Sequence, residues 1–179
     1  MDREWILNDR ILKRINDVLE TCSEAMKVEI ESIVLFGSKA RGDRNSQNDY
    51  EIMILVSNET NIKDYVKLIN TIRLEILKEK LFTSQILVYT SEIFEDILYN
   101  DKITGTFLYM ICRENIILFD KYNTFRAIKE RITNGSVKEE EEFINQCIEF
   151  AKIFGSDKWA QKWEKNLMQY KYLKKRRDY

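Results

Sequence analysis

The chain has 179 residues, of which 44% are hydrophobic and 33% are charged, and its formal net charge is -1. This length and composition predict an ordinary soluble globular protein of one domain, or of one domain with a helical appendage. The near-neutral charge excludes a global attraction to nucleic acid or to an anionic membrane, and the lack of histidine excludes imidazole bases and histidine zinc sites. Neither a membrane span nor a signal peptide is recognisable, so we expect a cytoplasmic protein without a membrane partner.

Helical and strand patterns follow one another over the first 120 residues. In chain order we expect a helix at 4–27, a strand at 29–36, a short helix from Ser38, a strand at 49–56, a long helix at 58–80, a strand at 83–89, a helix from Ser91, a helix at 103–113 and a short strand at 116–119. A helix joins the second and third strands, so these strands should lie in one sheet with a right-handed crossover. The order predicts an α+β fold: a small mixed sheet backed by helices on one face, with the other face open.

The last sixty residues have helical patterns only. A capping box at Ser136-Val137-Lys138-Glu139 opens one helix, Gly155 ends it, and Ser156 or Asp157 caps the next, which predicts a helical hairpin. We therefore divide the chain into a domain at 1–120 and an appendage at 121–179 that packs on the same core. Only Asn134-Gly135 marks a boundary, within 121–135.

The most informative pattern is Gly37-Ser38, followed after ten residues by Asp49-Tyr50-Glu51. The first pair ends an apolar run, as at a turn from a buried strand into a helix, where backbone N–H groups favour an anion. Side chains alternate along a strand, so Asp49 and Glu51 should share one face and could hold a divalent cation. A plain turn and two solvated acids are the alternative for each half alone. Together the two halves supply the phosphate-binding turn and the metal ligands that are needed to bind a nucleoside triphosphate.

The segment from Leu35-Phe36-Gly37-Ser38-Lys39-Ala40-Arg41-Gly42-Asp43 to Asn48-Asp49-Tyr50-Glu51-Ile52 closely resembles the minimal nucleotidyltransferases of the DNA polymerase beta superfamily. Their motif is Gly-Ser, a ten-residue gap and Asp-x-Asp, with Ala-Arg-Gly after the Gly-Ser. The resemblance is strong over about 30–57 and continues more weakly to about 120. It implies the polymerase beta palm-like fold and transfer of a nucleoside monophosphate, with AMP from ATP as the first expectation.

The resemblance also implies a set of site residues. Asp49 and Glu51 are the expected catalytic residues and ligands of Mg²⁺, with Mn²⁺ as the alternative. Gly37, Ser38 and Arg41 are the expected phosphate-binding residues, and Lys39 is a weaker candidate because it can point to solvent. An exposed helix charge is the alternative for Arg41.

Two positions depart from the family pattern. Glu51 stands where the second carboxylate is usually Asp, and its extra methylene can displace the metal. Gln85 stands where the family usually places a third carboxylate, and its neutral amide cannot act as a base. A replacement acid from Glu139–Glu142 or Glu149 is a weaker alternative, since these residues suit a solvated helix start.

Three functions stay open. The first is a metal-dependent nucleotidyltransferase whose acceptor hydroxyl lies on a partner protein, such as a helical toxin neutralised by this chain as antitoxin, or on a small hydroxylated molecule. The second is a catalytically impaired nucleotide- or partner-binding module, and the third is a structural interaction protein. For the basic stretch Lys171–Arg177 we favour a solvated helix end over contact with RNA. Self-association is left open.

Overall fold

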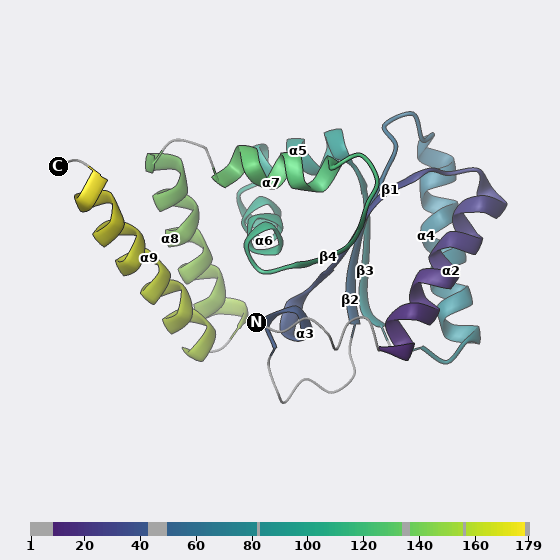
Figure 1. Ribbon diagram of the computed structural model, residues 1–179, viewed down its shortest axis with the longest axis horizontal. Coiled ribbons are helices and arrows are strands. Elements are labelled where there is room, and N and C mark those ends of the chain that lie inside the picture. Colours follow the sequence, from purple (N-terminus) through teal and green to yellow (C-terminus); the bar gives the residue numbers. More distant parts are fainter. Residues whose placement is uncertain (1–8, 43–49, 82, 134–136, 156, 178–179) are drawn as a thin grey trace. The chain divides into compact units, whose positions relative to one another are not determined.

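The computed structural model describes residues 9–42, 50–81, 83–133, 137–155 and 157–177. Within them a four-stranded sheet is combined with helices, which confirms the α+β class and the helical C-terminal region (Figure 1). The elements are α2 (Arg10–Met26), β1 (Ile30–Phe36), α3 (Gly37–Arg41), β2 (Tyr50–Val56), α4 (Ile62–Lys78), β3 (Thr83–Thr90), α5 (Ser91–Asn100), α6 (Lys102–Arg113), β4 (Ile116–Asp120), α7 (Thr124–Thr133), α8 (Val137–Phe154) and α9 (Asp157–Arg177).

Contacts between residues divide the chain into two compact units. The first comprises 1–93 and 114–125 and holds the whole sheet with α2, α3 and α4; the second comprises 94–113 and 126–179. Helix α6 and most of α5 therefore group with the C-terminal helices, although they precede β4 in the chain. The domain division at residue 120 stays a prediction.

The strand order in the sheet is β3-β2-β1-β4. β1 pairs antiparallel with both β2 and β4, and β2 pairs parallel with β3. The parallel pair is the one joined by the long helix α4, as expected for two strands of one sheet linked by a crossover. The carboxyl end of β1 and the start of β2 are neighbours, because Phe36 pairs with Glu51.

Helices α2 and α4 lie side by side and cover one face of the sheet (Figure 1). Both helices bury an apolar stripe at helical spacing, and both stripes pack against alternate residues of the strands. This core includes Leu12, Ile15, Leu19 and Cys22 of α2, Leu68, Ile72 and Ile76 of α4, and Leu35, Tyr50, Ile52, Ile54 and Val88 of the sheet. Tyr50 therefore belongs to the helix-covered face at the very start of β2.

The opposite face of the central strands is also buried. Val34, Met53 and Leu55 are fully inaccessible and Phe36 is 2% exposed, although these residues alternate with those that face α2 and α4. The expectation of an open face was wrong for β1 and β2. The continuous apolar runs of these strands already carried the signal, because a strand buried on both faces lacks alternation.

Helix α2 begins later than predicted. Asp9 has an extended backbone, and its side chain accepts hydrogen bonds from the N–H groups of Ile11 and Leu12, as an N-cap does. At the other end Lys27 adopts a left-handed conformation, and its N–H group bonds to the carbonyl of Glu24. The predicted single helix over 4–27 was therefore wrong at Asp9, which caps a helix instead of continuing one, and the predicted part at 4–8 lies outside the described residues.

The region at 121–135 was expected to hold a boundary, but most of it is helix α7. Its buried residues Phe125, Ile128 and Ile132 follow helical spacing, so periodicity alone could have found it. In the second unit α8 and α9 pack side by side as the predicted hairpin (Figure 1). Trp163 of α9 is fully buried. None of the helices that the structure describes has the length and apolarity needed to cross a bilayer.

Candidate functional site

The turn at Gly37 positions the candidate phosphate site. β1 ends at Phe36, and α3 starts at once with Gly37 at φ +73°, a conformation that glycine adopts without strain. The N-cap residue Phe36 has an apolar side chain, which accepts no hydrogen bond from the first N–H groups of α3. Sequence reasoning placed the helix start at Ser38, one residue later than in the structure.

The carboxylate of Glu51 lies directly against this turn. The backbone N–H of Ser38 donates a hydrogen bond of 3.2 Å to Glu51 Oε2. A Cβ atom added to Gly37 would lie only 1.4 Å from the same oxygen, so glycine is what admits the carboxylate. The structure thus brings Gly37, Ser38 and Glu51 together, and a negatively charged group already occupies the helix start, where an anion is favoured.

Arg41 lies one turn further along α3 and faces a carboxylate. Its Nε is 3.7 Å from Oε2 of Glu114, and the two side chains are only 18% and 10% exposed. A carboxylate that is this poorly solvated is stable only with cationic or hydrogen-bonding neighbours. Arg41 is therefore not the exposed helix charge that was its alternative. Glu114, in the turn before β4, had no sequence signal that linked it to the site.

Lys39 does not point to solvent either. Its Nζ lies 3.6 Å from the centre of the Tyr50 ring and 4.0 Å from Asp9 Oδ2, and the Tyr50 hydroxyl donates a 2.6 Å hydrogen bond to the same oxygen. Burial, and then the hydrogen bond to Asp9, raise the pKa of Tyr50 well above its usual range, so its hydroxyl stays protonated. Sequence reasoning missed this arrangement, because Asp9 was placed inside a helix.

Asp49 lies outside the described residues, so its side chain cannot be placed against Glu51. Within the part of the chain that the structure describes, no group of three or more Asp, Glu, Cys or His side chains is arranged to hold a metal ion. The pairing of Asp49 with Glu51 stays a prediction from strand alternation.

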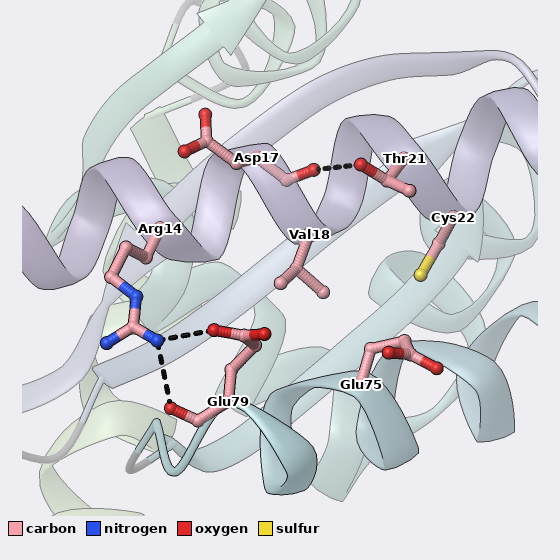
Figure 2. Close-up of a pocket in the computed structure, with 7 residues that line it drawn as sticks. All are labelled: Arg14, Asp17, Val18, Thr21, Cys22, Glu75 and Glu79. Atoms are coloured by element: carbon pink, nitrogen blue, oxygen red, sulfur yellow. Dashed lines mark hydrogen bonds and ion pairs between the residues drawn. The ribbon is translucent and has the colours of Figure 1, made fainter.

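A cavity elsewhere in the first unit contains none of the predicted site residues. It has a volume of about 320 Å³, lies between α2 and α4, and is lined by Arg14, Asp17, Val18, Thr21, Cys22, Glu75 and Glu79. Figure 2 shows the Arg14 guanidinium bonded to both the carboxylate and the backbone carbonyl of Glu79. About half of each of these two side chains is exposed, so this pair is a surface ion pair between two packed helices.

Comparison with known proteins identifies the family. The family described as "Polymerase beta, Nucleotidyltransferase" matches residues 16–124, which is more than half of the chain. The chain belongs to the polymerase beta nucleotidyltransferase family. A protein of Methanocaldococcus jannaschii named "Putative protein adenylyltransferase MJ0141" is 30% identical over 77 residues, which cover 43% of this chain and 78% of that protein. No solved structure matches the chain significantly.

This member of the family has glutamine at the place where the resemblance implies a third carboxylate. Gln85 pairs with Glu51 in the parallel register of β2 and β3, so both residues stand side by side near the start of their strands. Of the suggested replacement acids, Glu142 and Glu149 are exposed, and neither belongs to a described metal-binding group. Glu141 forms a 2.9 Å ion pair with Lys171, the first residue of the basic stretch at the end of α9.

Proposed function

We propose that this nucleotidyltransferase moves a nucleoside monophosphate, AMP from ATP in the first instance, to a hydroxyl group of a partner protein. The observation that carries the proposal is the 3.2 Å hydrogen bond from the Ser38 N–H to Glu51, since it joins the phosphate turn to a candidate metal ligand on β2. The name of the Methanocaldococcus jannaschii relative supports a protein as the acceptor. A helical toxin and a small hydroxylated molecule are the other acceptors to be tested.

The donor groups fit a hard divalent cation. Asp49 and Glu51 would hold Mg²⁺, or Mn²⁺ if the longer glutamate distorts the octahedral geometry that magnesium requires. Bound there, the metal would neutralise charge on the triphosphate and favour ionisation of the attacking hydroxyl.

The chain's own residues do the positioning. Gly37 lets a phosphate approach the backbone. In the nucleotide complex the Glu51 carboxylate would turn from the N–H of Ser38 toward the metal, and the N–H groups at the start of α3 would then donate to the phosphate. Arg41 adds a cation on the same short helix. The acceptor oxygen forms a bond to the α-phosphorus, the bond from that phosphorus to the β-phosphate oxygen breaks, and pyrophosphate leaves while the hydroxyl loses its proton. Holding these groups in line accounts for most of the catalysis expected of such a site.

The assay follows the α-phosphate. The protein is incubated with α-labelled ATP, GTP, CTP or UTP and with Mg²⁺ or Mn²⁺, and candidate acceptors are added one class at a time. The proposal expects label on a protein acceptor, with one pyrophosphate released per label transferred. Label on a small molecule would show that the acceptor is a small molecule and not a protein. An absence of both nucleotide binding and pyrophosphate release would overturn the proposal of a transferase.

A second candidate is a catalytically impaired nucleotide-binding module, and Gln85 beside Glu51 is the observation that favours it. An acid at this position could serve as general base or third metal ligand, and general-base catalysis contributes on the order of a hundredfold or more to a rate. The impaired module would bind metal and nucleotide but release no pyrophosphate with any acceptor.

Replacement of Gln85 by aspartate is therefore expected to raise turnover, by about a hundredfold if a base is what is missing. Gln85→Asn is the matched control, because asparagine has the size of aspartate without its charge, and it should not raise turnover. The rate of pyrophosphate release measures both variants. An equal rise in both would assign the effect to side-chain size, and no rise in either would show that an acid at this position does not limit the reaction.

A further inference from the structure

Asp9, Lys39 and Tyr50 form a small cluster in which three elements meet. Asp9 is the N-cap of α2, Lys39 belongs to α3, and Tyr50 is the first residue of β2. One oxygen, Asp9 Oδ2, accepts the 2.6 Å hydrogen bond from the Tyr50 hydroxyl and lies 4.0 Å from Lys39 Nζ. The other oxygen, Oδ1, accepts the two hydrogen bonds that cap α2. A single carboxylate thus links α2, α3 and β2.

The cluster lies behind the candidate site. Tyr50 and Glu51 are consecutive residues of a strand, so their side chains leave opposite faces of the sheet. Tyr50 belongs to the core packed under α2 and α4, whereas Glu51 reaches the start of α3 at Ser38. The short helix α3 is therefore held from both sides: Lys39 contacts Tyr50 on one face, and Ser38 contacts Glu51 on the other.

Low solvent exposure makes these contacts specific. Tyr50 is 1% exposed, and the side chains of Lys39 and Asp9 are 17% and 14% exposed. A buried hydroxyl and two poorly solvated charges are costly unless they are paired, so each member of the cluster favours one arrangement of the other two. An ammonium group over an aromatic ring adds a further attraction when both are partly desolvated.

We propose that Asp9, Lys39 and Tyr50 are positioning residues that fix the phosphate turn at Gly37-Ser38 relative to Glu51 near the start of β2. The proposal rests on the proposed function, because it assigns the cluster to the geometry of the metal and triphosphate site. Lys39 and Tyr50 each lie next to a candidate site residue in the chain, Ser38 and Glu51, so a loosened cluster shifts both halves of the site. Shifts of about 1 Å at a reaction centre can cost as much as a hundredfold in rate.

Asp9→Asn tests the cluster with little change to α2. Asparagine caps helices as well as aspartate does, so its oxygen can keep the hydrogen bonds to the N–H groups of Ile11 and Leu12. Its NH₂ group then stands where Oδ2 was, and it can neither accept from Tyr50 nor attract Lys39. Tyr50→Phe removes the donor from the other side. We expect each variant to weaken Mn²⁺ binding about tenfold and to raise the KM for the triphosphate.

Tyr65→Phe is the matched control. The hydroxyl of Tyr65, on α4, donates to the carbonyl of Val88 on β3, so this variant also loses one tyrosine hydrogen bond within the same unit. Its loss of thermal stability should resemble that of Tyr50→Phe, while Mn²⁺ binding should stay at the wild-type value. If Tyr65→Phe weakens Mn²⁺ binding as much as Tyr50→Phe does, the cluster contributes only stability and the proposal is overturned.

Amide hydrogen exchange tests the structural effect of the cluster in the absence of ligand and without an activity assay. Amides in 36–42 and 50–56 should exchange faster in Asp9→Asn and Tyr50→Phe than in the wild type and in Tyr65→Phe. Unchanged exchange in both segments would overturn the proposal even if the transferase activity is demonstrated. Conversely, a wild-type protein that binds neither Mn²⁺ nor any triphosphate refutes the proposed function. Faster exchange in the variants would then show that the cluster orders α3 and β2 but positions no metal or triphosphate site.

Discussion

Replacing Glu51 with glutamine is expected to slow nucleotidyl transfer about a thousandfold while the fold stays intact. The amide keeps the length of the side chain, and its oxygen can still accept the N–H of Ser38. It has no charge, however, and a neutral amide is a poor substitute for a carboxylate at a hard divalent cation. Loss of one electrostatic contribution to a transition state typically costs two to three orders of magnitude, so a rate about 10³ times lower is expected.

The same substitution should have little effect on stability. A carboxylate at the start of a helix contributes about 0.5 kcal/mol through the helix dipole, and the hydrogen bond can persist. Glu79→Gln is the matched control: Glu79 pairs with Arg14 at the cavity between α2 and α4, and its loss should leave the transfer rate unchanged. If Glu51→Gln retained more than about a tenth of the wild-type rate, Glu51 would not be the metal ligand assigned here.

Glu51→Asp separates charge from reach. Aspartate restores the residue usual in the nucleotidyltransferase family and shortens the side chain by one methylene. We expect transfer to be retained and the metal preference to move from Mn²⁺ toward Mg²⁺, because the shorter ligand suits the tighter octahedral geometry of magnesium. The metal preference is measured as the ratio of the transfer rate with Mn²⁺ to the transfer rate with Mg²⁺. An unchanged ratio would show that the extra methylene of Glu51 does not determine the choice of metal.

The elements that could be predicted are those with strong local patterns. The continuous apolar runs of β1 and β2 and the helical stripe of α4 led to the right element types, with boundaries off by a few residues. Asp9 shows the limit: apolar periodicity runs past it, yet its side chain caps α2, and capping competes locally with continuation of the helix. The missed helix α7 shows the opposite error. The turn signal Asn134-Gly135 was given more weight than the helical spacing of Phe125, Ile128 and Ile132.

The residues of the candidate site also fall into those that the sequence could predict and those that it could not. Gly37, Ser38 and Glu51 could be connected from the sequence, because a strand, a turn and a neighbouring strand bring them together through local geometry. The partners Asp9 and Glu114 could not, because each comes from a distant element and carries a residue type that is common on any surface. Their meaning depends on register: Tyr50 faces α2 only because it starts β2 on that side of the sheet. Such contacts follow from tertiary packing and leave no periodic trace in the sequence.

Gly105→Ala is expected to destabilise the second unit by about 3 kcal/mol, although alanine is the better helix former by about 1 kcal/mol. Gly105 is buried in α6, and only Asp101 separates α6 from α5. A Cβ atom at residue 105 would lie 2.6 Å from the carbonyl oxygen of Leu98 and 2.7 Å from that of Ile97, near the end of α5. These are backbone atoms, so relief of the clash requires α5 and α6 to move apart.

Thr104→Ala is the matched control, because it makes an alanine one residue earlier in the same turn. The N–H of Thr104, which bonds to Asp101 Oδ1, is unaffected by that change, so the cap of α6 should persist. Urea unfolding, followed by helical circular dichroism, compares the two variants through their midpoints at equal slope. A Gly105→Ala protein as stable as the wild type, or more stable, would mean that intrinsic helix propensity outweighs the clash and that the α5–α6 corner can open without cost. A lower midpoint for Gly105→Ala alone would show that this corner is set by the close approach of two backbones, a contact that only a residue without a side chain allows.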